Sequence, residues 1–136
     1  MSTKDYLSQA YRIDQRINSK LAQVMSLRDL LGKATGTLSG APKAATPNPH
    51  SMEETIAKMV DLENEINEDI DALVDLKAEI MRRIKRVENT EYQTILELRY
   101  LCFKRWEEIA VEMGYSLRRL YELHDCALEE ISKSPH

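Results

Sequence analysis

Hydrophobic residues recur every seven positions along most of the first 88 residues. One row runs through Ala10, Ile17, Val24 and Leu31, and its companion runs through Tyr6, Ile13 and Leu27. A longer row runs through Met52, Met59, Ile66, Leu73, Ile80 and Val87. A spacing of seven is typical of helices that pack along a seam. The pattern therefore predicts one helix over residues 3–31 and another over residues 51–88.

Residues 32–50 separate the two periodic segments and show no periodicity of their own. Their sequence is rich in Gly, Pro, Ser, Thr and Ala, so it predicts a loop in which His50 is a solvated residue. Ser51 and Glu54 then have the spacing of a capping box, in which the serine caps the helix and the glutamate reaches back. This box predicts that the second helix begins at Ser51.

The second predicted helix is too long for a chain of this size to cover. Its residues, about 38 at ~1.5 Å each, give a rod of roughly 57 Å. Additional apolar positions widen its stripe beyond a two-helix seam. We therefore expect residues 1–88 to fold as an antiparallel helical hairpin that pairs with a second chain. The residues expected at this homodimer interface are Met59, Ile66, Ile70, Leu73 and Ile80.

The last third of the chain has a shorter helical pattern. Thr90 and Gln93 have the spacing of another capping box, which predicts a third helix. Two short amphipathic helices follow, joined by residues 114–116. Their predicted inward faces are Trp106, Ile109, Ala110 and Met113 in the first and Leu120, Leu123, Ala127 and Ile131 in the second. A glycine turn and a serine cap between two such helices are typical of a helix-turn-helix, although a plain αα-hairpin needs the same spacing.

The predicted fold is therefore all-α, with a hairpin at residues 1–88 and a small trihelical helix-turn-helix domain at residues 89–136. In a helix-turn-helix, the second helix enters the DNA major groove. Two arginines lie in the first turn of that helix, and two cations precede the first helix, where a helix N-terminus can meet a phosphate. The predicted DNA-binding residues are Lys104, Arg105, Ser116, Arg118, Arg119, Tyr121, Glu122 and Asp125.

The same segment carries the motifs of a known class of regulators. These are Leu98-Arg99 with a following aromatic, Trp106 to Ala110, Met113 to Ser116, the arginines at 118 and 119, Leu120, and Ala127-Leu128. The segment resembles region 4 of bacterial σ70-type factors and, more closely, the ArpU-like phage and prophage regulators. Leu117 and Tyr121 stand where region 4 is often basic. The resemblance implies a sequence-specific transcriptional regulator that binds double-stranded DNA, with RNA polymerase or another host protein as a further partner.

Charge keeps a second class of function open. The chain has a net charge of -4, which argues against a general nucleic-acid binder. Residues 81–136 contain equal numbers of acidic and basic residues. The alternative is a protein-interaction module that binds a host protein through the acidic hairpin or through the surface of the motif.

The sequence contains little that indicates catalysis or metal binding. Carboxylates between Asp61 and Glu79 have a spacing that can share Mg²⁺, but of the signature of all-α nucleotide pyrophosphatases only Glu68-x-x-Asp71 is present. His124 and Cys126 are too close in a helix to share a face. We therefore expect no enzyme activity, cofactor or metal. The chain has no apolar run of ~20 residues and no signal-peptide core, so we expect a cytoplasmic protein.

Overall fold

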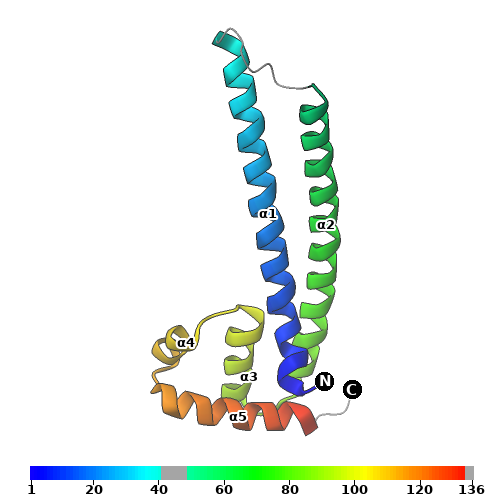
Figure 1. Cartoon of the computed structure of the whole chain (residues 1–136). Helices are drawn as coiled ribbons and strands as arrows, with labels where there is room; N and C mark the ends of the chain where they lie inside the picture. Colours follow the sequence, from blue (N-terminus) through cyan, green and yellow to red (C-terminus); the bar gives the residue numbers. More distant parts are fainter. Residues whose placement is uncertain (41–48, 134–136) are drawn as a thin grey trace. The chain divides into compact units, whose positions relative to one another are not determined.

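The computed structural model describes residues 1–40 and 49–133, with the backbone alone for residues 34–40 and 49–51. These residues form five α-helices and one π-helical segment and contain no strand, which confirms the all-α class (Figure 1). The elements are α1 (Thr3–Gly40), α2 (Pro49–Lys85), α3 (Thr90–Leu96), η1 (Glu97–Leu101), α4 (Trp106–Met113) and α5 (Leu117–Lys133). None of the helices in this described part combines the length and the hydropathy that a bilayer span requires.

Both long helices extend into the segment that was predicted to be a loop. α1 continues to Gly40, and α2 begins at Pro49 rather than at Ser51. A glycine inside a helix costs only about 1 kcal/mol relative to alanine, so the glycines after residue 31 do not end α1. Proline is favoured at the first helical position because its missing N–H needs no partner there. The predicted loop at residues 32–50 is therefore wrong at both ends, and residues 41–48 lie outside the described residues.

The chain divides into two compact units. Unit 1 contains residues 1–14 and the residues from 72 onward, and unit 2 contains residues 15–71. Each long helix thus contributes one part to each unit. The packing groups the start of α1 and the end of α2 with the shorter helices. The division into functional domains at 1–88 and 89–136 stays a prediction.

Within unit 2, α1 and α2 bury an apolar row that contains a charged group. Ile17, Val24 and Ile66 are buried. Lys20, which interrupts the predicted companion row, places its Nζ 2.7 Å from Asp69 Oδ2. Asp69 is itself buried, and hydrogen bonds from this lysine and a nearby arginine hold the pKa of its carboxyl below the usual value, although burial opposes them. The apolar row is therefore interrupted by a satisfied ion pair.

The ion pairs also show that the two segments of unit 2 run in opposite directions. Arg16 Nη2 donates to Asp69 Oδ1 at 3.2 Å, and Lys20 Nζ also lies 3.2 Å from Glu65 Oε1. Further along α1, Arg28 Nη2 is 3.8 Å from a Glu63 carboxylate oxygen. Later residues of α1 thus pair with earlier residues of α2, so the two segments are antiparallel.

Unit 1 has two hydrophobic clusters. The first combines both long helices with α3, η1 and α5 through Leu7, Ala10, Ile80, Ile84, Val87, Leu96, Tyr100, Ala127 and Ile131. The second combines α3, α4 and α5 through Ile95, Ile109, Ala110, Leu120 and Leu123, with Trp106 and Met113 half-buried against it. The predicted inward faces of the two short helices are confirmed, because helical periodicity reports which side of a helix packs.

α3 is capped one residue earlier than predicted. Asn89 Oδ1 accepts hydrogen bonds from the backbone N–H of Glu91 at 2.9 Å and of Tyr92 at 3.2 Å. Asparagine is among the strongest N-cap residues. The predicted capping box between Thr90 and Gln93 is wrong, because the Gln93 side chain donates to the backbone carbonyl of Val87. This contact ties the first turn of α3 to the segment that follows α2.

Candidate functional site

A glycine turn and a serine cap connect α4 to α5. Gly114 has a φ of 74°, in the left-handed region that glycine adopts at low cost. The N–H groups of Gly114 and Tyr115 both donate to the carbonyl of Ala110, at 2.9 and 3.0 Å. Ser116 Oγ accepts a hydrogen bond from the backbone N–H of Arg119 at 3.1 Å, so the predicted cap is present.

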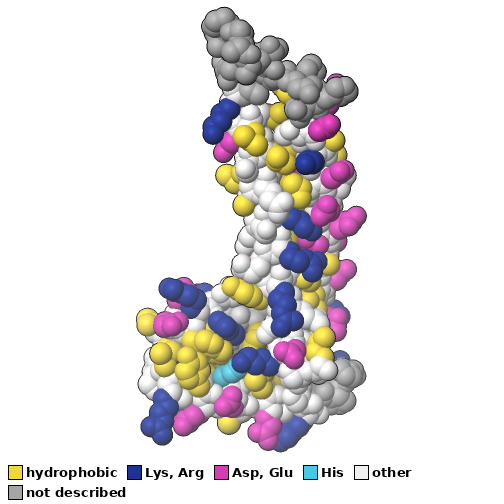
Figure 2. Space-filling model, viewed as in Figure 1, with side chains coloured by type: hydrophobic (Ala, Val, Ile, Leu, Met, Phe, Trp, Pro, Cys, Tyr) yellow, Lys and Arg dark blue, Asp and Glu magenta, His cyan; other side chains and the backbone are white. Residues whose placement is uncertain are grey.

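The predicted DNA-binding residues of α5 lie on its exposed side. Those exposed are Arg118, Arg119, Tyr121, Glu122 and Asp125. The rings of Tyr121 and Trp106 meet edge to face, with 5.5 Å between centroids, so Tyr121 contacts α4. In Figure 2, Lys and Arg side chains gather with hydrophobic ones over the part of the view that contains the short helices.

Three of the four predicted cations are paired with glutamates. The pairs are Lys104–Glu112, Arg105–Glu108 and Arg119–Glu122, the last two with nitrogen–oxygen distances of 3.4 Å. The hydrogen bond that Lys104 Nζ donates to the Glu112 carboxylate raises the pKa of Lys104. Arg118 is exposed and has no carboxylate partner within the part of the chain that the structure describes. It is therefore the predicted cation most available to a ligand.

A buried polar contact between η1 and α5 was missed by sequence reasoning. Tyr100 Oη and His124 Nε2 are hydrogen-bonded at 2.7 Å, and both side chains are buried. Burial lowers the pKa of His124 to about 4 and raises that of Tyr100 to about 12, so both are neutral at pH 7. The available signal was position, because His124 lies one turn from Leu120 and Ala127, on the apolar stripe of α5.

The residues predicted to form a dimer interface are mostly used inside the single chain. Ile66 and Ile80 are buried, and Met59 and Leu73 are half-buried. Ile70 alone among the five is exposed, at 41%. The large apolar residues that unit 2 exposes are instead Leu21, Met25 and Leu30 on α1 and Ile56, Val60 and Ile70 on α2. Figure 2 shows hydrophobic side chains among charged ones over both helices.

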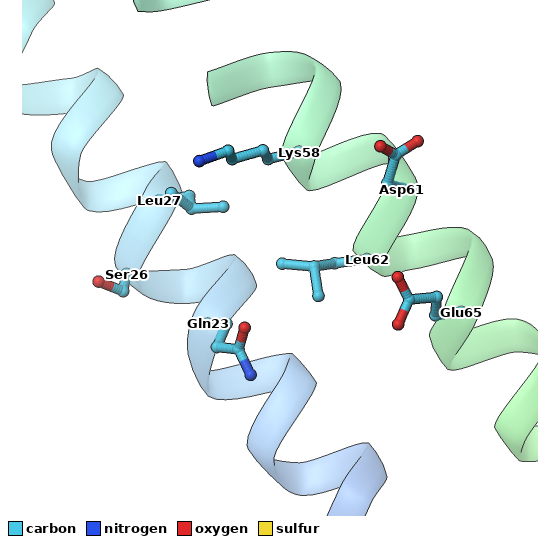
Figure 3. Close-up of a pocket in the computed structure, with 7 residues that line it drawn as sticks. All are labelled: Gln23, Ser26, Leu27, Lys58, Asp61, Leu62 and Glu65. Atoms are coloured by element: carbon cyan, nitrogen blue, oxygen red, sulfur yellow. The ribbon is translucent and has the colours of Figure 1, made fainter. Parts of the chain in front are cut away.

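A groove of about 490 Å³ lies between α1 and α2 in unit 2. Leu27 and Leu62 point toward each other across it, and Lys58 extends from α2 toward α1 (Figure 3). Asp61 and Glu65 also line it, at the helical spacing noted for shared Mg²⁺. However, the described residues contain no group of three or more His, Cys, Asp or Glu side chains that could hold a metal ion.

Comparison with known proteins shows a family for this chain. Residues 49–132, more than half of the 136 residues, match the model of the family described as protein of unknown function, DUF1492. The chain therefore belongs to the DUF1492 family. No curated protein and no solved structure matches it. The matched segment begins at the first residue of α2 and ends in the last turn of α5.

Proposed function

We propose that this protein is a sequence-specific DNA-binding transcriptional regulator of a phage or prophage. In this proposal, α1 and α2 form a dimerising hairpin, and α4, the turn and α5 form a helix-turn-helix like that of σ70 region 4 and the ArpU-like regulators. The observation that carries the proposal is the start of α5, where a serine cap precedes Arg118, an exposed cation without a carboxylate partner among the described residues. Residues at this place in a helix-turn-helix contact base edges.

The charge pairs around α4 are compatible with phosphate binding. Arg105 and Arg119 lie 3.4 Å from their glutamates, and each of the four side chains is at least half exposed. Exposed ion pairs contribute only about 0–1 kcal/mol. A DNA phosphate can therefore replace a glutamate at either arginine at small cost, since a guanidinium can bind a phosphate through two N–H donors. Glu122 would then be free to accept hydrogen bonds from bases in the groove, as would the exposed Asp125.

The exposed apolar side chains of unit 2 support association with a second copy. Leu21 and Met25 are one turn apart on α1, as are Ile56 and Val60 on α2, so each pair shares a helix face. Each Å² of apolar surface that association buries contributes about 25 cal/mol of favourable free energy, so these faces can supply affinity. A dimer would bring two copies of α5 to two half-sites.

A protein-interaction module is the second candidate function. Val111 on α4 is 83% exposed, and Leu117 and Tyr121 at the start of α5 are 39% and 44% exposed. Exposed apolar side chains beside balanced charges are compatible with a surface that binds another protein. A host protein would then dock on the surface that the first proposal gives to DNA.

Selection of DNA from a random or phage-genomic pool tests the first proposal. We expect enrichment of a two-fold-related site, with affinity that falls as salt is raised. Arg118→Ala should weaken the selected site by roughly 1–3 kcal/mol and relax one base position. Arg12→Ala removes one exposed charge from α1 and should leave specificity unchanged. The docking function replaces the DNA-binding one if wild type enriches no DNA sequence and Arg118→Ala fails to bind a host protein that wild type captures.

A further inference from the structure

A smaller pocket in unit 1, of about 160 Å³, combines cations with aromatic walls. It is lined by Lys4 and Tyr11 from α1, by Arg99 and Tyr100 from η1, and by Phe103 and Arg105 from the segment that precedes α4. Among the described residues, this lining contains three cations and no carboxylate. Arg105 is paired with Glu108, so the charge of the lining is only partly balanced, and a concave site with net positive charge favours an anionic occupant.

The two arginines of this pocket are positioned by contacts that leave most of their donors unused. Arg99 Nη1 donates to the backbone carbonyl of Lys104 at 3.0 Å, and its guanidinium lies 4.6 Å from the centroid of the Trp106 ring. Arg105 uses its Nε toward Glu108. Since a guanidinium has five N–H donors, each arginine keeps several for a ligand.

The backbone around the pocket departs from regular helix at two points. The N–H of Cys102 donates to the carbonyl of Glu97 at 3.0 Å, which makes the turn that carries Arg99 and Tyr100 a π-helix. Phe103 then has a φ of 60°, which is unfavourable for a residue with a side chain. π-helical turns and left-handed non-glycine residues are both concentrated at functional sites. Here both deviations fall on residues of one pocket.

The aromatic wall of the pocket is also fixed. The rings of Tyr11 and Phe103 meet edge to face, with 5.6 Å between centroids, and Lys77 Nζ lies 4.6 Å from the centroid of the Phe103 ring. On another side, the hydroxyl of Tyr100 is held by its hydrogen bond to His124. Burial is the main cause of the lowered pKa of His124; the charge of Asp125 opposes it, and the smaller effects of Lys4 and Arg99 add to it.

We propose that this pocket binds a small organic phosphate, held by Lys4, Arg99 and Arg105 through a terminal phosphate group. A phosphate monoester carries a charge of about −1.5 to −2 at pH 7 and three acceptor oxygens, which suits three cations better than a single carboxylate would. The volume admits a phosphoryl group and a few further atoms, and the rings offer an apolar surface to the organic part. Lys4 and Arg99 lie outside the proposed DNA-reading set, so the site goes beyond that function and shares only Arg105 with it.

Titration of the full-length chain with inorganic phosphate and with phenyl phosphate tests this site. The buffer contains chloride at constant ionic strength and neither phosphate nor sulfate. Amide resonances of residues 99–105 are followed by NMR, and the melting temperature is measured in parallel. We expect saturable shifts in these resonances, tighter binding of phenyl phosphate than of inorganic phosphate, and weaker binding of benzoate. Absence of a saturable shift with both phosphates overturns the proposal.

Substitutions separate this pocket from the surface proposed for DNA. Lys4→Gln should weaken phenyl phosphate binding roughly ten-fold or more, the effect of losing one charged hydrogen bond. Lys133→Gln removes an exposed charge from the end of α5 and should bind like wild type, and Arg118→Gln should also keep phosphate binding. Equal affinities for Lys4→Gln and wild type would refute the assignment. If free phosphates do not bind, and Lys4→Gln weakens only the binding of duplex DNA, the pocket contacts the DNA backbone instead.

Discussion

Buried His124 gives the folding free energy a pH dependence whose size follows from the structure. Burial depresses its pKa from 6.5 to about 4 in the folded protein. The neutral ring therefore favours folding, and this stabilisation is fully present above the unfolded value of 6.5. It is lost as the pH falls from there toward about 4, because the unfolded chain binds the proton first. At about 1.4 kcal/mol per pH unit, the loss between pH 7 and pH 4.5 is about 2 kcal/mol.

Urea denaturation of wild type and of His124→Gln at the two pH values measures this loss. Glutamine retains a polar group for Tyr100 but does not titrate. Carboxylates that protonate in the same range contribute to both proteins and cancel in the comparison. Wild type should lose about 2 kcal/mol more than the variant between pH 7 and pH 4.5. Equal losses, or an NMR titration in which the His124 ring protonates near pH 6.5, would refute the argument.

Three further predictions address the cap, the ion pair and the dimer. Ser116→Ala should cost about 1 kcal/mol in thermal melting, whereas Ser116→Asp retains the cap and should cost less. Asp69→Asn should be less stable than wild type at pH 7, and the two should converge as the pH falls below 3.8, the usual aspartate value, because the lowered pKa of Asp69 stabilises the fold only while it is ionised. Ile70→Glu should reduce association in sedimentation while keeping helicity, whereas Ile80→Glu should reduce helicity itself; a monomeric wild type at tens of micromolar would contradict the dimer.

The sequence alone predicts the helices and their buried faces well. The short helices fall where periodicity places them, and Ile109, Leu120, Ala127 and Ile131 are buried as expected. Helical periodicity succeeds because residues three and four apart share one face of a helix, and that face is buried whichever partner packs on it. It could not tell which partner covers Ile66 and Ile80, because a seam inside one chain and a seam between two chains require the same spacing.

The candidate phosphate pocket could not be predicted from the sequence. Lys4 and Arg99 lie far apart in the chain and meet only through packing within unit 1. No capping or periodicity signal in the sequence indicates the π-helical turn, the φ of Phe103, or the hydrogen bond from the Lys104 N–H to the carbonyl of Leu98 that closes this turn. Several helix ends were also predicted incorrectly. A single glycine in a helix, or a choice between two neighbouring cap residues, changes the free energy of the helix by only about 1 kcal/mol.

The ion pair between Lys20 and Asp69 has a consequence for the alignment of the two long helices. A heptad pattern repeats, so sliding α1 along α2 by seven residues would leave most apolar contacts intact. The same slide would bring Lys20 level with Leu62 or Leu76 and leave an ammonium group beside leucine. We infer that this pair selects one register among near-equivalent ones, the best-attested role of a polar group in an apolar seam. A Lys20→Leu, Asp69→Leu double variant should then stay helical but give cysteine crosslinks in more than one alignment.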